Sequence, residues 1–211
     1  MMGGLLNLVL AYLIGSVSGS LLLGRLKHVD IRTMGSGNAG GTNAFRTQGL
    51  VFALGVVLID VGKALLATAL VPGLGRAAEA GLLSGQALQL ACAGAVILGH
   101  CYPLYHGFRG GKGAATTVGC LLVIAPWLLA PMLLTWLLVL AVSGYVGLAT
   151  VVAGFSLVPA AWLVFGPSPV LVFTVAVALF MTFTHRGNLS RMREGTEGRF
   201  NRPRLARWLR R

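Results

Sequence analysis

Three segments of the sequence carry most of the side chains that could do chemistry, and each is rich in glycine and basic residues. They read GSGNAGGTNAFR at 35–46, GHCYPLYHGFRGGKG at 99–113 and THRGNLSRMREGTE at 184–197. Glycines let a backbone approach a ligand closely and turn its N–H groups toward an anion. Amides, hydroxyls and guanidinium groups beside such a turn add further donors and charge. Together the segments predict a site for a phosphorylated or otherwise anionic molecule.

In the first segment, glycines such as Gly35 and Gly37 free the backbone to approach a ligand. Its polar side chains are candidate donors to that ligand: Ser36, Asn38, Thr42, Asn43 and Arg46. The alternative is a flexible loop whose polar residues only contact water, because asparagine and glycine suit turns for ordinary reasons. This segment alone leaves both interpretations open.

The second segment ends in a turn that resembles the tail of a Walker A loop, built from Gly110, Gly111, Lys112 and Gly113. It departs from that pattern because Gly113 replaces the serine or threonine and no strand is predicted before it. A helix predicted from residue 114 nevertheless adds an N-terminus to the backbone donors and the ammonium. The alternative is a basic loop that only fixes membrane topology.

In the third segment, His185 and Asn188 are three residues apart and share a face if the last helix continues through them. His185 is a candidate general base, phosphate donor or capping residue. Glu197 is expected to orient a partner or to pair with an arginine. No carboxylate stands at a spacing that makes an evident histidine–acid dyad, so the sequence alone assigns no base.

The composition places these segments in a membrane protein. Of 211 residues, 56% are hydrophobic and only 10% are charged, which indicates membrane helices. We expect one membrane domain over 1–200 and a basic cytoplasmic tail over 201–211, either lying on lipid headgroups with Trp208 as anchor or disordered. Nucleic acid is not expected as a partner, because the basic residues directly follow a membrane span. The apolar runs cover about 4–24, 50–72, 84–99, 114–142, 146–165 and 169–184.

Lysine and arginine predict the topology. The positive-inside rule places all three glycine-rich segments in the cytoplasm and the N-terminus outside. The chain must then cross an even number of times between 113 and 185, so 114–142 is predicted to break near Pro126 or Pro131 into two short helices. The expected fold is an all-α integral membrane protein with seven transmembrane helices, two of them short, and a cytoplasmic C-terminus. A single long helix over 114–142 is the alternative, and it would place the last segment outside.

Charged and sulfur-bearing residues within the apolar runs are expected to be structural. Asp60 and Lys63 lie at i, i+3 in one run and predict an ion pair that holds the helices. The cysteines at 92, 101 and 120 predict small buried side chains rather than disulfides or a metal site. His100 and His106 are expected to be interfacial or structural.

The three segments, in this order, resemble the three motifs of the bacterial acyl-phosphate-dependent glycerol-3-phosphate acyltransferases. The resemblance covers about residues 4–200. It implies a seven-helix protein of the bacterial plasma membrane with its site facing the cytoplasm. It also implies transfer of a fatty acyl group from acyl phosphate to the 1-hydroxyl of glycerol 3-phosphate, giving lysophosphatidic acid. No cofactor is expected, and the protein is expected to be a monomer among membrane lipids.

The resemblance also assigns roles by motif. It implies that glycerol 3-phosphate is held by Ser36, Arg46, Lys112, His185 and Asn188. The acyl phosphate's phosphate is expected at the 110–113 turn with Asn38 and Thr42, while Asn43 and Glu197 support the site. It further suggests that the acyl phosphate itself takes the hydroxyl proton.

The sequence departs from the family pattern at 144–150, and three rival functions are weighed against the resemblance. At 144–150 the family tends to read Arg-Tyr-Val-Ser-Leu-Ala-Ser, whereas this chain reads GYVGLAT, so Gly144 and Gly147 replace an arginine and a serine. A phosphate transporter is disfavoured because its site would lie at the midplane and be reached from both sides. A lipid-binding scaffold does not account for the asparagines. Acyltransferases with a His-x4-Asp pair are disfavoured because no histidine here has that aspartate.

Overall fold

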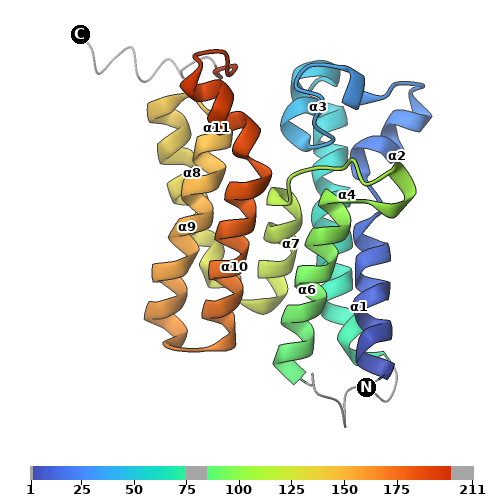
Figure 1. Cartoon of the computed structure of the whole chain (residues 1–211), viewed down its shortest axis with the longest axis vertical. Coiled ribbons are helices and arrows are strands. Elements are labelled where there is room, and N and C mark those ends of the chain that lie inside the picture. The colour runs from blue at the N-terminus through green and yellow to red at the C-terminus, as the bar shows by residue number, and fades with distance from the viewer. Residues whose placement is uncertain (1, 75–84, 201–211) are drawn as a thin grey trace. The chain divides into compact units, whose positions relative to one another are not determined.

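The computed structural model describes residues 2–74 and 85–200, and these residues are helical with connecting turns and contain no strand (Figure 1). They divide into two compact units, Met1–Ala125 and Pro126–Arg211. The predicted tail over 201–211 lies outside the described residues. An all-α fold is therefore confirmed for the part of the chain that the structure describes.

Helix α4 is the centre of the first unit, since it contacts α1, α2, α3, α6 and α7. The helices are α1 Met2–Gly15, α2 Gly19–Leu26, α3 Gly41–Gln48, α4 Leu50–Leu70, α6 Gly85–Cys101 and α7 Ala114–Ile124. Short 3-10 turns cover Ile31–Thr33, Val71–Gly73 and Leu104–His106. Helices α4 and α6 match the predicted apolar runs to within a few residues.

Glycines allow the helices of this unit to pack closely. A Cβ added to Gly99 of α6 would overlap the carbonyl oxygen of Tyr12 in α1. A Cβ added to Gly119 of α7 would likewise overlap the carbonyl oxygen of Val61 in α4. Membrane helices gain most of their association energy from such close packing, because lipid offers no hydrophobic driving force.

The first apolar run is not one straight helix. It forms α1 and α2, which are bent by 44° at a break. Lys63 Nζ donates to the carbonyl oxygens of Gly15 (2.8 Å) and Val17, and the N–H of Gly19 donates to Asp60 Oδ1 (3.2 Å). The predicted ion pair is confirmed, with Lys63 Nζ 3.1 Å from Asp60 Oδ1. This buried pair satisfies backbone groups that the break exposes, which is why the break is tolerated within an apolar run.

Helix α9 is the centre of the second unit, where it contacts α8, α10 and α11. The helices are α8 Leu129–Ser143, α9 Val146–Phe165, α10 Pro169–Thr184 and α11 Arg186–Arg193, with a 3-10 turn at Pro126–Leu128. The bounds of α9 and α10 coincide with the predicted runs. Apolar side chains such as Leu134, Leu138 and Val142 of α8 are exposed, as expected of a surface that faces lipid.

The 114–142 run breaks where the sequence predicted. Helix α7 ends at Ile124, and the chain turns at Ala125 and Pro126 before α8 begins. Pro131 instead lies in the first turn of α8, where its missing N–H leaves no helical hydrogen bond unmade. The alternative of one continuous helix over 114–142 is therefore wrong.

The last apolar run does not continue straight into the third glycine-rich segment. Helices α10 and α11 are bent by 52° at His185, which ends one helix and begins the other. By length and composition, four described helices could cross a membrane, or six if each bent pair forms one span. Helix α7 is apolar but shorter, with 11 residues.

Candidate functional site

The first glycine-rich segment is a loop folded around the side chain of Asn43. This buried amide donates to the carbonyl oxygens of Ile31 (2.9 Å) and Met34 (3.0 Å), and its Oδ1 accepts from the N–H of Ser36 (2.9 Å). Gly35 has φ +56°, and a Cβ there would overlap Asn43 Oδ1. Only glycine fits this position, because the backbone is left-handed and the amide fills the space beneath it.

The other predicted residues of this segment lie around that loop. Ser36 and Arg46 are exposed, whereas Asn38 and Thr42 are half-buried. Thr42 and Arg46 belong to helix α3, which begins directly after the glycines. Gly37 has φ +71° and is exposed. The segment therefore has solvent-accessible polar side chains, and the buried amide of Asn43 holds its backbone in place.

The second segment ends in an extended turn that rests on the end of α6. The N–H of Gly110 donates to the carbonyl oxygen of Cys101 (3.2 Å), and the N–H of Gly111 donates to that of His100 (3.1 Å). Gly113 is left-handed, with φ +90°, and caps α7. Lys112 is half-buried between these glycines. The first N–H groups of α7 have no partners within the helix, so this turn has the geometry that suits an anion.

Two hydroxyl groups near this turn stand out. The side-chain oxygens of Thr116 and Thr117, in the first turns of α7, are buried without a hydrogen-bond partner among the described residues. Buried hydroxyls are usually paired, since desolvating an unpaired one costs about 1–3 kcal/mol. The start of α7 therefore contains two hydroxyl groups that form no hydrogen bond with the described residues.

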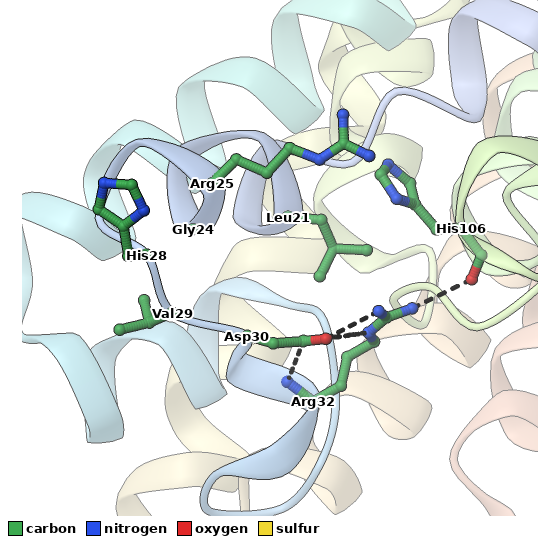
Figure 2. Close-up of a pocket in the computed structure, with 8 residues that line it drawn as sticks. All are labelled: Leu21, Gly24, Arg25, His28, Val29, Asp30, Arg32 and His106. Atoms are coloured by element: carbon green, nitrogen blue, oxygen red, sulfur yellow. Dashed lines mark hydrogen bonds and ion pairs between the residues drawn. The ribbon is translucent and has the colours of Figure 1, made fainter.

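The sequence did not predict a basic cavity that lies beside these loops (Figure 2). It has a volume of about 400 Å³, and Arg25, His28, Arg32 and His106 are among the residues that line it. Figure 2 shows the side chains of Arg25, Arg32 and His106 converging on it. None of the predicted site residues lines this cavity.

Arg32 ties the two loops of this unit together. It forms an ion pair with Asp30 (2.7 Å) and donates from Nη1 to the carbonyl oxygen of His106 (3.0 Å). The hydrogen bonds from Arg32 lower the pKa of Asp30 below its usual value. Asp30 and Arg32 lie shortly before the first glycine-rich segment. Their spacing of two residues is a sequence signal that could have indicated this ion pair.

In the third segment, His185 is buried at the bend between α10 and α11. Its Nδ1 lies 2.8 Å from the carbonyl oxygen of Met181. Since a carbonyl only accepts, Nδ1 carries the proton, and in the neutral ring Nε2 carries the lone pair. His185 can therefore accept a hydrogen bond at Nε2.

Asn188 is held by Glu197, as the sequence suggested for that acid. The Asn188 amide donates to Glu197 Oε1 (2.7 Å), and Glu197 Oε2 accepts from Arg191 Nε (2.8 Å). Gly147 of α9 packs against this arrangement, because a Cβ there would lie 2.7 Å from Asn188 Cβ. The absence of a side chain at 147 is therefore part of how Asn188 is placed.

The structure brings the predicted residues together in groups. Ser36, Gly35 and Asn43 meet in the first loop, and Asn188 meets Glu197 in the second unit. The sequence did not predict that the carbonyl oxygen of His100 binds the second loop at the Gly111 N–H. The sequence did give Asp60 and Lys63 as a pair.

Comparison with known proteins supplies the family. The sequence matches the family described as Glycerol-3-phosphate acyltransferase over residues 5–195. A glycerol-3-phosphate acyltransferase of Chlorobaculum tepidum is 36% identical, covering 92% of this chain and 95% of that protein. One of Coxiella burnetii is 35% identical, covering 93% of this chain and 97% of that protein.

Solved structures agree. The fold is similar to the crystal structure of PlsY (YgiH), an integral membrane glycerol 3-phosphate acyltransferase, in its glycerol 3-phosphate form. The TM-score is 0.83 at 30% identity, covering 94% of this chain and 96% of that one. The lysophosphatidic acid form of PlsY matches with a TM-score of 0.81. The protein is therefore an integral membrane enzyme, and it belongs to the glycerol-3-phosphate acyltransferase family.

Proposed function

We propose that this enzyme transfers a fatty acyl group from acyl phosphate to the 1-hydroxyl of glycerol 3-phosphate, giving lysophosphatidic acid and phosphate. The hydroxyl oxygen bonds to the acyl carbon, and the bond from that carbon to the phosphate oxygen breaks. The proton of the hydroxyl passes to the leaving phosphate. The two PlsY structures, in glycerol 3-phosphate and lysophosphatidic acid forms, support this choice of acceptor and product.

The turn at 110–113 is the observation that carries the choice of donor. Its backbone precedes the N-terminus of α7, with Gly113 left-handed and Lys112 beside it. A helix N-terminus and an adjacent ammonium stabilise phosphate oxygens. In acyl phosphate the same phosphate is both the headgroup and the leaving group, so donors that hold it also stabilise the charge that develops as it departs. Asn38 and Thr42 are proposed to contact this phosphate as well.

Glycerol 3-phosphate is proposed to be held by residues of the three glycine-rich segments. Arg46 and Lys112 supply positive charge for its phosphate, and Arg46 offers a planar fork of donors. Ser36, His185 and Asn188 supply hydrogen bonds that orient the glycerol, so that its 1-hydroxyl faces the acyl carbon. Glu197 acts through Asn188, whose amide it holds.

His185 has no role as a classical dyad base in this scheme. A dyad would place a carboxylate at Nδ1, whereas Nδ1 of His185 donates to the main-chain oxygen of Met181. The ring is therefore proposed to accept a hydrogen bond from substrate at Nε2, while the acyl phosphate takes the proton. That division of labour requires no enzyme base.

The enzyme is proposed to lie in a bacterial plasma membrane, as a monomer with its site facing the cytoplasm. Six spans arise if each bent helix pair is one span, and α7 is proposed as a seventh, short membrane helix. At about 1.5 Å per residue, α7 is shorter than the roughly 30 Å hydrocarbon core. Seven helices place the N-terminus outside and the third glycine-rich segment in the cytoplasm.

The test uses purified protein in lipid vesicles. Incubation with acyl phosphate and glycerol 3-phosphate is expected to yield lysophosphatidic acid and free phosphate in equal amounts. Acyl-coenzyme A supplied in place of acyl phosphate is expected to give no product. No product from acyl phosphate, or equal product from both donors, contradicts the proposal.

A further inference from the structure

We propose that a buried cluster of Asp60, Lys63 and His100 positions both glycine-rich loops of the first unit for catalysis. These three are positioning residues and do not touch substrate. The inference rests on the proposed function only in taking the 110–113 turn as the seat of the donor's phosphate. The cluster joins helices α4 and α6, on which these residues stand.

The cluster is nearly closed to solvent. Asp60 is 1% exposed, Lys63 is 7% exposed and His100 is 2% exposed. Lys63 Nζ lies 3.0 Å from His100 Nδ1 and 3.1 Å from Asp60 Oδ1. Charged side chains within membrane segments are costly and mark functional positions. A buried ion pair can often be replaced by apolar residues without loss of stability, so its presence suggests a role in specifying geometry.

His100 connects the cluster to the second loop. A lysine ammonium only donates, so His100 Nδ1 accepts from Lys63 and the neutral ring bears its proton on Nε2. The Nε2 edge occupies the space that a Cβ on Gly111 would need. The backbone of the turn is also bound to the end of α6, with the Gly111 N–H donating to the His100 carbonyl oxygen. A rotation of the ring would therefore displace Gly111, and with it Lys112.

The same cluster reaches the first loop through the break between α1 and α2. Lys63 holds the carbonyl groups before the break, and Asp60 holds the N–H of Gly19 after it. One residue further on, the hydroxyl of Ser20 donates to the carbonyl oxygen of Ala39 (2.9 Å). Ala39 lies within the first glycine-rich segment, so the direction of α2 sets where that loop stands.

Two anion-binding loops therefore depend on one cluster. A positioning error of about 1 Å can cost roughly a hundredfold in rate. The cluster keeps the loops in place without placing its own charge in the site. Its loss is expected to loosen the loops while the apolar helices remain packed.

The structural test is hydrogen–deuterium exchange on the full chain in lipid nanodiscs. The double variant Asp60→Asn with Lys63→Met removes both charges at similar side-chain size, so it leaves no unpaired buried charge. Peptides covering 35–46 and 108–114 are expected to exchange about fivefold faster or more, with α9 and α10 unchanged. Asn7→Ala is the matched control, because Asn7 is a buried polar residue of α1 outside the cluster. Unchanged exchange in both loops overturns the proposal, as does an equal rise throughout the first unit.

A second variant keeps the test decisive if the double variant does not fold. His100→Gln retains an amide that can reach Lys63 but removes the ring beneath Gly111. It is expected to raise exchange in 108–114 and to leave 35–46 as in the parent protein. Equal exchange at 108–114 in this variant and the parent contradicts the role given to His100.

The kinetic test separates positioning from a loss of folded protein. In His100→Gln, the KM for acyl phosphate is expected to rise about tenfold or more, and kcat is expected to fall as well, because the same donors stabilise the charge on the leaving phosphate. A purely structural defect lowers kcat in proportion to folded protein and leaves KM unchanged. A parent enzyme that uses acyl-coenzyme A instead of acyl phosphate would overturn the proposed function. The exchange experiment would still decide the positioning role in that case.

Discussion

Lys112 in the second glycine-rich segment and His185 in the third have different proposed roles. Lys112 lies between Gly111 and Gly113, directly before α7, where its charge adds to the partial positive charge of the helix N-terminus. His185 sits at a helix bend with its Nδ1 proton committed to Met181. The first residue adds charge, whereas the second offers a lone pair at a fixed place.

Lys112→Ala is expected to lower turnover about a hundredfold to a thousandfold, because it removes a donor to the charge that develops on phosphate. His185→Ala is expected to lower turnover about a hundredfold, because it removes a hydrogen bond that orients the glycerol. Release of phosphate measured under saturating substrates checks both, with thermal unfolding showing that each variant stays folded. Lys27→Ala and Thr182→Ala are the matched controls. Near-normal turnover in either active-site variant removes that residue from the mechanism.

Glu197 offers a sharper residue-scale test, because the chain contains a matched acid three residues earlier. Glu197 holds the Asn188 amide and Arg191, whereas Glu194 accepts only from the exposed hydroxyl of Ser190 among its described contacts. Hydrogen bonds to a charged group contribute about 1.5–3 kcal/mol, so Glu197→Ala is expected to lower turnover about tenfold or more. Glu194→Ala is expected to change turnover less than twofold, because an exposed contact contributes little free energy. Similar losses in both variants would contradict the orienting role.

Helix elements position these side chains by breaking at particular residues. The bend at His185 turns α11 away from the axis of α10, so His185 and Asn188 are not simply one face of a straight helix. The position of the Asn188 side chain then depends on the space that α9 leaves for it. Gly147 is the residue of α9 that makes that room, so the departure at 147 has a structural explanation.

Gly147→Ser is expected to displace Asn188, because its Cβ would lie 2.7 Å from Asn188 Cβ. The loss in turnover is expected to be about tenfold or more, with stability lowered by about 1–3 kcal/mol through overpacking. Gly62→Ala in α4 is the control, since a Cβ there meets nothing within 4 Å. Steady-state kinetics and thermal unfolding of both variants make the comparison. Unchanged turnover in Gly147→Ser would show that Asn188 tolerates the shift or does not act on substrate.

At the scale of the whole molecule, the open question is the membrane topology. The positive-inside rule predicts it from the sequence, and the helix boundaries alone do not determine it. Helices α7 and α9 end at Ile124 and Phe165, but helix ends alone do not show which helices cross the membrane. Whether α7 and α8 count as two crossings fixes the side on which the third glycine-rich segment lies. The charge of that segment favours the cytoplasm.

Cysteine labelling in intact cells checks this prediction. Thr47→Cys and Ser190→Cys are expected to react only with a reagent that enters the cytoplasm, because seven crossings place both there. Pro167→Cys, in the turn between α9 and α10, is expected to react with a reagent that cannot cross the membrane. The three native cysteines are buried, so they contribute little background. Labelling of position 190 from outside would overturn the seven-helix topology.

Much of the fold could be predicted from the sequence because apolar runs and prolines act locally. The limits of α9 and α10, the break at Pro126 and the Asp60–Lys63 pair all follow from neighbours in the chain. The family too followed from the sequence, since its motifs are contiguous. The break between α1 and α2 did not, because what stabilises it is a lysine 46 residues away from Val17.

The sequence by itself determined an all-helical membrane chain with three polar, glycine-rich segments, because burial in lipid dictates residue type along each helix. Only the tertiary structure decided what lies beneath those segments. It placed the amide of Asn43 under the first loop, His100 under the second, and Glu197 behind Asn188. Such contacts join side chains through distance and angle rather than through spacing, so no local pattern in the chain records them.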